Sequence, residues 1–167
     1  MKRKKIVVAV SGGFDPIHIG HVRLFEHARA LGDTLVVILN NDNWLHKKKR
    51  HIFMPENERK EILATLRPVD RVVLTKHPKD PKDMSVSREL RALRPDIFAN
   101  GGDRDKKNAA DPTSPLYRDI NTCKELGIRM AFNVGHGGKV QSSSWLLEKY
   151  LKKAANRRAT ALERKGR

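Results

Sequence analysis

Residues 12–21 read Gly-Gly-Phe-Asp-Pro-Ile-His-Ile-Gly-His and lie between two segments with regular apolar patterns. The run before them, residues 6–10, is short and rich in β-branched side chains, which is typical of a buried strand. The segment after them, residues 22–31, has apolar side chains at helical spacing. Residues 12–21 are therefore predicted to form the turn between a strand and a helix.

The residue types in this turn favour a phosphate ligand. Gly12 and Gly13 let the backbone turn sharply and approach a ligand closely. Gly20 leaves space beside the first turn of the helix, whose free N–H groups and positive dipole end suit an anion. His18 and His21 are three residues apart, so that both imidazoles can face the same anion on a helical turn. The turn is predicted to bind a polyphosphate.

The same ten residues resemble the signature Gly-x-Phe-Asp-x-x-His-x-Gly-His of the nucleotidyltransferases of the cytidylyltransferase-like superfamily, and they agree with it at every defined position. The resemblance extends over about residues 6–151 and is greatest to the glycerol-phosphate cytidylyltransferase and heptose-phosphate adenylyltransferase branch. It implies transfer of a nucleoside monophosphate from CTP or ATP to a phosphorylated small molecule, with release of pyrophosphate.

The resemblance also assigns roles within the turn. His18 and His21 would be catalytic and would stabilise the transferring and leaving phosphates. Asp15, together with residues 100–103, would shape the acceptor and base pockets. The nucleotide-binding residues implied in this stretch are Gly12, Gly13, Phe14, Asp15 and Gly20.

Alternating strand and helix patterns predict an α/β, Rossmann-like open parallel sheet of about five strands with helices on both faces. The predicted strands are residues 6–10, 34–39, 71–75, 96–99 and 128–134, and the predicted helices are 22–31, 56–66, 85–93, 116–126 and 142–151 or beyond. Residues 1–151 are expected to form the nucleotidyltransferase domain, and residues 152–167 a basic C-terminal tail that continues the last helix or frays. Ligands of such sheets bind at the carboxyl ends of the strands, near a topological switch point.

Composition limits the class of protein. A chain of 167 residues with 38% apolar residues is sized for one globular domain with a core. The single cysteine, Cys123, excludes a disulfide framework and a cysteine metal cluster, and is expected to be a buried thiol on a helix. No apolar run is long enough to span a membrane and the N-terminus lacks an apolar signal region, so a cytoplasmic protein is expected.

The net charge of +16 is concentrated in three segments. Residues 2–5 and 47–50 carry four positive charges each, and residues 152–167 carry seven against the single Glu163. Such clusters favour anions in general and allow weak association with nucleic acid through the basic ends. A solvated end is the more common role of a basic tail.

Residues 40–50 are polar and are predicted to form a loop at the carboxyl end of the second strand. A run of lysines is, by itself, equally typical of a solvated loop. The resemblance assigns catalytic roles to Lys47 and Lys49, which would hold the triphosphate and the acceptor. Arg67, in the stretch Leu-Arg-Pro-Val-Asp, would lie near the nucleotide base, although a charged helix end explains it equally well. The preceding helix is predicted to bury Ile62, Leu63 and Leu66.

Two later segments resemble further nucleotide-binding motifs of the superfamily. Asn100-Gly101-Gly102-Asp103 is similar to its Gly-Gly-Asp turn, which would place Gly101, Gly102 and Asp103 against the base. Gln141-Ser142-Ser143-Ser144 occupies the place of its serine-threonine motif, and these residues would hold the β- and γ-phosphates at a helix N-terminus. Helix capping alone is the simpler role of the serines.

One departure from the family pattern separates its branches. The glycerol-phosphate branch has an arginine before the serine motif, whereas residues 135–139 here read Gly-His-Gly-Gly-Lys. Either Lys139 or His136 replaces that arginine, or the chain lies closer to the adenylyltransferase branch, which also lacks it. The acceptors of the branch are glycerol phosphate with CTP, and heptose phosphate or flavin mononucleotide (FMN) with ATP.

The remaining expectations concern cofactors and partners. Mg²⁺ is expected as the cofactor and, because the sequence has no dense carboxylate cluster, it would be held mainly by the nucleotide phosphates and not by a metal site of the protein. The resemblance allows a homodimer. The rival function is a nucleotide- or RNA-binding protein that keeps the fold without the reaction.

Overall fold

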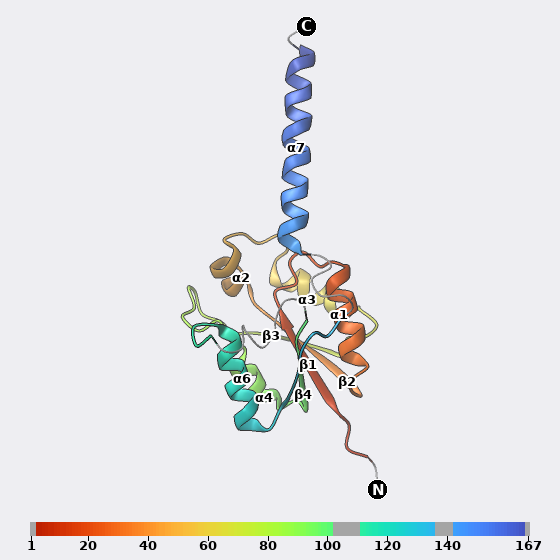
Figure 1. Ribbon diagram of the computed structural model, residues 1–167, viewed down its shortest axis with the longest axis vertical. Helices are drawn as coiled ribbons and strands as arrows, with labels where there is room; N and C mark the ends of the chain where they lie inside the picture. Colours follow the sequence, from red (N-terminus) through yellow and green to blue (C-terminus); the bar gives the residue numbers. More distant parts are fainter. Residues whose placement is uncertain (1–2, 102–110, 136–141, 166–167) are drawn as a thin grey trace.

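The computed structural model describes residues 3–101, 111–135 and 142–165 (Figure 1). The strands in the described residues are β1 (Val7–Gly12), β2 (Thr34–Leu39), β3 (Arg71–Leu74), β4 (Ile97–Ala99) and β5 (Arg129–Ala131). The helices there are α1 (Ile19–Arg29), α2 (Asp42–Lys49), α3 (Glu56–Ala64), α4 (Ser87–Leu93), α6 (Pro115–Leu126) and α7 (Ser143–Lys165).

The strands form one parallel sheet in the order β3-β2-β1-β4-β5. After β1, the chain forms β2 and β3 on one side of β1. It then crosses to the other side of β1 and forms β4 and β5. The topological switch point therefore lies between β1 and β4, where open α/β sheets bind their ligands. The predicted Rossmann-like sheet of five parallel strands is confirmed.

Helices cover both faces of the sheet because side chains alternate along each strand. Val8 and Val10 of β1 lie in one apolar cluster with Phe25 of α1 and Leu63 of α3. Ala9, between them, lies in a second cluster, which contains Leu90 of α4 and Cys123 of α6. Figure 1 shows α1 and α3 on one side of the sheet and α4 and α6 on the other. Cys123 is buried on a helix, as predicted.

Residues 42–49 form helix α2, so the prediction of a loop over residues 40–50 was wrong. The Asn41 side chain caps the helix by accepting the Trp44 N–H at 3.1 Å, and its basic residues gather in the last turn, where the helix dipole favours positive charge. The helix ends at Arg50, which is in the left-handed conformation with φ 62°. A cap and a favourable dipole thus stabilise a helix with only one buried side chain, Leu45.

The buried face of α3 also differs from the prediction. Leu63 is buried, but Ile62 is 37% exposed. Arg59 takes the other buried position of the helix, with 1% of its surface exposed. Hydrophobic periodicity could not reveal this arrangement because the buried residue is charged.

The last helix, α7, has 23 residues and extends away from the sheet, at the opposite end of the molecule from the N-terminus (Figure 1). Its backbone includes residues 152–165, so that most of the basic segment continues the helix, which is the first of the two predicted alternatives. β5 is shorter than predicted and covers only Arg129–Ala131. None of the helices in the described residues has the length and apolarity needed to cross a membrane.

Candidate active site

Residues 12–21, which we call the signature turn, connect β1 to the start of α1 at the switch point. Phe14 is buried with φ +49°, and its ring lies edge-on to Phe25 at a centroid distance of 5.0 Å. A Cβ on Gly12 would come within 2.8 Å of the Phe14 ring, and one on Gly13 within 2.6 Å of the Leu45 side chain. The two glycines are thus needed to pack the turn against the protein's own side chains.

His18 and His21 lie side by side at the start of α1. Their rings are stacked with centroids 3.6 Å apart, and the edge of the His21 ring contacts Phe14. The His18 backbone N–H donates to Nδ1 of His21 at 3.3 Å. This nitrogen is therefore unprotonated, and the proton of neutral His21 is on Nε2. Nδ1 of His18 is buried and has no hydrogen-bond partner among the described residues.

Both histidines are biased toward the neutral form. Burial lowers the pKa of His21 to about 3, with smaller contributions from His18 and Lys49. Burial, and then the charge of Lys49, also lowers the pKa of His18. At neutral pH the pair therefore offers neutral imidazoles, which stabilise a phosphate as hydrogen-bond donors and add no positive charge of their own.

The structure separates the two predicted lysines. Lys49 Nζ donates to the backbone carbonyl of Asp15 at 2.7 Å, which brings its ammonium to the signature turn. Burial lowers the pKa of Lys49, while the Asp15 carboxylate opposes this effect. Lys47 instead pairs with Asp80 at 2.5 Å, and both side chains are largely exposed.

Lys47 also lines a cleft of about 730 Å³. The lining residues come from α2, residues 50–52 and residues 79–80, and do not include His18, His21 or Lys49. In this structure only Lys49 of the two lysines is positioned beside the histidines. The structure thus places Lys49 at the turn and Lys47 at Asp80, and the catalytic role of both lysines stays a prediction.

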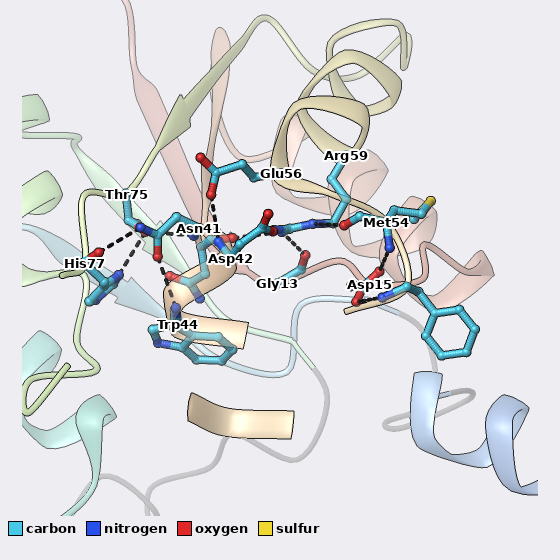
Figure 2. Close-up of polar contacts among 12 residues, drawn as sticks. Gly13, Asp15, Asn41, Asp42, Trp44, Met54, Glu56, Arg59, Thr75 and His77 are labelled. Atoms are coloured by element: carbon cyan, nitrogen blue, oxygen red, sulfur yellow. Dashed lines mark hydrogen bonds and ion pairs between the residues drawn. The ribbon is translucent and has the colours of Figure 1, made fainter. Parts of the chain in front are cut away.

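Asp15 has a supporting position in the turn. It is 1% exposed, and its two carboxylate oxygens accept the backbone N–H groups of Phe53 and Met54 at 2.8 and 2.9 Å. The carboxylate thus fixes the segment before α3 against the signature turn (Figure 2). Because both carboxylate oxygens bind backbone N–H groups, Asp15 contributes to the site by positioning the backbone of residues 53–54.

Arg59 joins the segments around the turn, and sequence reasoning assigned it no role. Its side chain is fully buried, and Figure 2 shows its guanidinium between Gly13, Asp42 and Met54. It donates to the carbonyls of Gly13 at 2.7 Å, Asn40 at 2.8 Å and Met54 at 2.9 Å, and to the Asp42 carboxylate at 2.6 Å. The signature turn, the end of β2 and the start of α2 are therefore held by one side chain.

Further polar contacts fix the start of α2. Glu56 accepts the Asp42 N–H at 2.7 Å, and the Asn41 side chain donates to the carbonyl of His77 at 2.9 Å (Figure 2). The Trp44 indole N–H donates to the carbonyl of Met84 at 2.9 Å. The sequence signal that could have identified this region is the adjacent acidic and basic pair Glu58 and Arg59 within α3.

The predicted base-binding turn is described only in part. Asn100 is buried, and its backbone pairs with Ala131 and Val134 of the neighbouring segment. A Cβ on Gly101 would lie 2.7 Å from the Val134 carbonyl oxygen and 2.9 Å from the Leu24 side chain, so that close packing explains this glycine. Gly102 and Asp103 lie outside the described residues.

The serine segment reaches the signature turn. The Ser143 hydroxyl donates to the carbonyl of Pro16 at 3.1 Å, and the Ser142 hydroxyl caps α7 by accepting the Trp145 N–H at 3.2 Å. Ser144 is exposed. The N-termini of α1 and α7 thus lie at the same turn. Gln141, and the two candidates for the missing arginine, Lys139 and His136, lie outside the described residues.

Arg67 lies in the link that leads to the amino end of β3, whereas the signature turn lies at the carboxyl end of β1, and its role near the nucleotide base stays a prediction. It is exposed in the link between α3 and β3. Nearby Asp70 pairs with the backbone of Leu35, the second residue of β2, at 2.7 Å. The site adjoins the other end of β2, at Leu39, roughly 13 Å further along the strand at about 3.3 Å per residue.

The described residues include no group of three or more His, Cys, Asp or Glu side chains that could hold a metal ion. Asp15, the carboxylate within the turn, uses both oxygens for backbone N–H groups. The expectation that Mg²⁺ is held mainly by the nucleotide phosphates stays a prediction.

Comparison with known proteins agrees with this geometry. The chain is 41% identical over 103 residues to an FAD synthase from Pyrococcus horikoshii, a match that covers 61% of this chain and 66% of that protein. It is also 41% identical over 105 residues to the bifunctional protein HldE from Syntrophotalea carbinolica, covering 61% of this chain and 20% of that protein. The chain thus spans slightly less than two thirds of the first relative and a fifth of the second.

A solved structure has a similar fold. The crystal structure of a lipopolysaccharide core biosynthesis protein from Thermoplasma volcanium matches with a TM-score of 0.60 at 26% identity, over 80% of this chain and all of that one. The sequence model described as "Cytidylyltransferase-like" matches residues 9–124, from β1 into α6, which is more than half of the chain. The protein with this stacked histidine pair at its switch point therefore belongs to the cytidylyltransferase-like family.

Proposed function

We propose that the protein transfers AMP from ATP to the phosphate of FMN and releases pyrophosphate. The observation that carries this proposal is the pair of stacked imidazoles, His18 and His21, beside the Lys49 ammonium at the N-terminus of α1. Neutral donors, a cation and free helix N–H groups are what a polyphosphate chain needs for binding.

The reaction needs little covalent help from the protein. An oxygen of the acceptor phosphate attacks the α-phosphorus of ATP, the bond from that phosphorus to the bridging oxygen of the β-phosphate breaks, and pyrophosphate leaves with the electron pair. The contribution of the chain is to hold the two anions in line and to stabilise the charge that develops on the leaving group. No proton has to be removed from the attacking phosphate oxygen.

Each residue has a specific task in this scheme. His21 donates from Nε2–H to a phosphate oxygen, since its Nδ1 already accepts the His18 N–H. Lys49 supplies positive charge next to the same turn. Ser142 and Ser143 lie at the N-terminus of α7, where free N–H groups would bind the β- and γ-phosphates. Mg²⁺ bound to the nucleotide would neutralise part of the phosphate charge.

The choice of FMN and ATP comes from the relatives. A FAD synthase joins FMN to the AMP of ATP, and the match to the Pyrococcus horikoshii enzyme includes 41% identity over 103 residues. The missing arginine before the serine motif also favours the adenylyltransferase branch over the glycerol-phosphate branch. Heptose phosphate with ATP is the second candidate acceptor, favoured by the similarity to HldE.

The test is a pyrophosphate-release assay with Mg²⁺, crossing ATP and CTP with FMN, heptose 1-phosphate and glycerol 3-phosphate. Release with ATP and FMN, accompanied by formation of FAD, is the expected result. Release with another pair would correct the substrates but keep the enzyme class. Folded protein that binds ATP and releases no pyrophosphate with any acceptor would favour the rival function, a binding protein. Salt-sensitive RNA binding would then support a role for its basic ends.

A further inference from the structure

Three large apolar side chains near the signature turn are exposed to solvent. They are Ile19 at 52%, Phe53 at 50% and Trp145 at 49%, and we call them the apolar rim. Among the described residues, the other large exposed apolar side chains are Ile52, Ile62, and Leu146, Tyr150 and Leu151 of α7. Only Ile62 lies away from both the turn and α7. Clustered exposed apolar side chains mark a binding site more often than isolated ones do.

The rim residues come from three segments that the fold joins at the signature turn. Ile19 directly follows His18 and is the first residue of α1. The Phe53 N–H donates to the buried Asp15 carboxylate at 2.8 Å. The Ser143 hydroxyl, two residues before Trp145, donates to the carbonyl of Pro16 at 3.1 Å. The three residues therefore lie close to residues 15–19, which include His18 and are followed by His21 in the first turn of α1.

The contacts hold these segments in place by their backbones and leave the side chains exposed. Asp15 binds the Phe53 N–H and not its ring, and the ring has one aromatic neighbour, His51, edge-on at 5.8 Å. Trp145 likewise offers its N–H to the Ser142 cap. These contacts fix the backbones near the signature turn while the apolar side chains stay accessible to a ligand.

We propose that the apolar rim binds the flat isoalloxazine ring of FMN, so that the FMN phosphate reaches the α-phosphate of the ATP held at His18 and His21. This inference rests on the proposed function and specifies which part of the site recognises the acceptor. An aromatic ring with apolar faces and polar edges covers such side chains and leaves its polar atoms in water. A sugar phosphate has less apolar surface and would gain less free energy from contact with Ile19 and Phe53.

The first experiment measures binding directly. Riboflavin and FMN are titrated into the full chain without ATP, and the fluorescence of the flavin is followed. Riboflavin has the ring without the phosphate, so that it reports the rim alone. We expect Phe53→Ser and Ile19→Ser to weaken the binding of both flavins about ten-fold, because each change removes apolar contact area. Ile62→Ser is the matched control, as an exposed apolar residue outside the rim.

The second experiment separates the acceptor from the nucleotide. In steady-state assays, Phe53→Ser should raise the KM for FMN about ten-fold, with the KM for ATP and kcat within two-fold of the wild-type values. Phe53→Leu, which keeps an apolar side chain, should fall between the two proteins. Thermal unfolding of each variant shows whether it is folded, and Phe53→Leu and Ile19→Ser keep the test valid if Phe53→Ser does not fold.

The outcomes are distinct for the two proposals. Flavin affinities of the rim variants equal to those of Ile62→Ser would overturn the rim, even if FAD is formed. Turnover of heptose phosphate without any flavin binding would refute the proposed role of the rim in flavin binding and leave the enzyme class unchanged. Rim-dependent riboflavin binding without pyrophosphate release would support the rim and contradict the proposed reaction. A dimer that dissociates on Phe53→Ser would identify the rim as a subunit interface and overturn this inference.

Discussion

Replacement of Arg59 by methionine tests whether one buried side chain holds the active-site segments together. Methionine has a similar length and is apolar, so the change removes the charge and the donors while filling much of the space. The Asp42 carboxylate, which is 32% exposed, loses its partner. The carbonyls of Gly13, Asn40 and Met54 lose theirs as well.

The magnitude follows from these lost contacts. Breaking a buried ion pair from one side costs about 3–5 kcal/mol, and each lost hydrogen bond to a charged group about 1.5–3 kcal/mol, although such terms are not additive. Removing the buried guanidinium also removes the cost of its desolvation. We therefore expect the free energy of unfolding to fall by about 3–5 kcal/mol, which corresponds to a decrease in Tm of roughly 10 °C for a chain of this size.

Urea unfolding followed by circular dichroism measures this change. Arg91→Met is the matched control, because Arg91 also forms an ion pair, with Glu125 at 2.7 Å, but its side chain is 48% exposed. An exposed pair contributes at most about 1 kcal/mol. If Arg59→Met lowers the free energy of unfolding no more than Arg91→Met does, the assignment of a central structural role to Arg59 is refuted.

Three further predictions concern the residues at the signature turn. The double change His18→Ala and His21→Ala should lower the rate of pyrophosphate release at least about 100-fold, since each lost transition-state donor costs a few kcal/mol. An unchanged circular dichroism spectrum would show that the variant is folded. Turnover within a few-fold of wild type would contradict the proposed chemistry. In the same assay, Lys49→Ala should reduce kcat/KM about 100-fold and Lys47→Ala less than five-fold. The reason is that Lys49 bonds to the turn, whereas Lys47 pairs with Asp80. Equal losses would show that both lysines reach the substrates. Burial in the folded protein holds the pKa of His21 at about 3, against an ordinary value of 6.5 for histidine. Between these two pH values the unfolded chain therefore binds one more proton than the folded protein does. The free energy of unfolding should therefore decrease as the pH falls below about 6.5, by up to about 1.4 kcal/mol per pH unit. Urea unfolding between pH 7 and pH 5 measures this slope, and an unchanged slope in His21→Asn would show that another group causes it.

The sequence predicted the parts of this protein that depend on local patterns. Apolar runs and helical spacing gave the alternation of strands and helices, from which a parallel sheet covered on both faces follows. The signature turn, residues 12–21, identified the family, because its residue types and their spacing match the family pattern at every defined position. Its position at the carboxyl end of β1 was also predictable, since it directly follows the first strand.

Helix α2 and Arg59 could not be predicted in this way. The helix depends on a cap, Asn41, and on contacts with Glu56 and Arg59 from another element, so that its own polar sequence resembles a loop. Arg59 is buried because four acceptors from three segments converge on it. A hydrophobic pattern assigns an arginine to the surface, as burial of a charge is favourable only when such partners are present.

The tertiary structure also decided which candidate side chains meet. Lys47 and Lys49 are two residues apart, but on α2 they point in different directions, and only Lys49 reaches the turn. Arg67 is close in sequence to active-site segments but lies before the amino end of β3, whereas the signature turn follows the carboxyl end of β1. The sequence by itself determined the family, the fold class and the histidine pair, because these depend on residue type and local spacing. The structure decided the supporting network and which of the two lysines reaches the signature turn, because a side chain's partners depend on packing between distant segments.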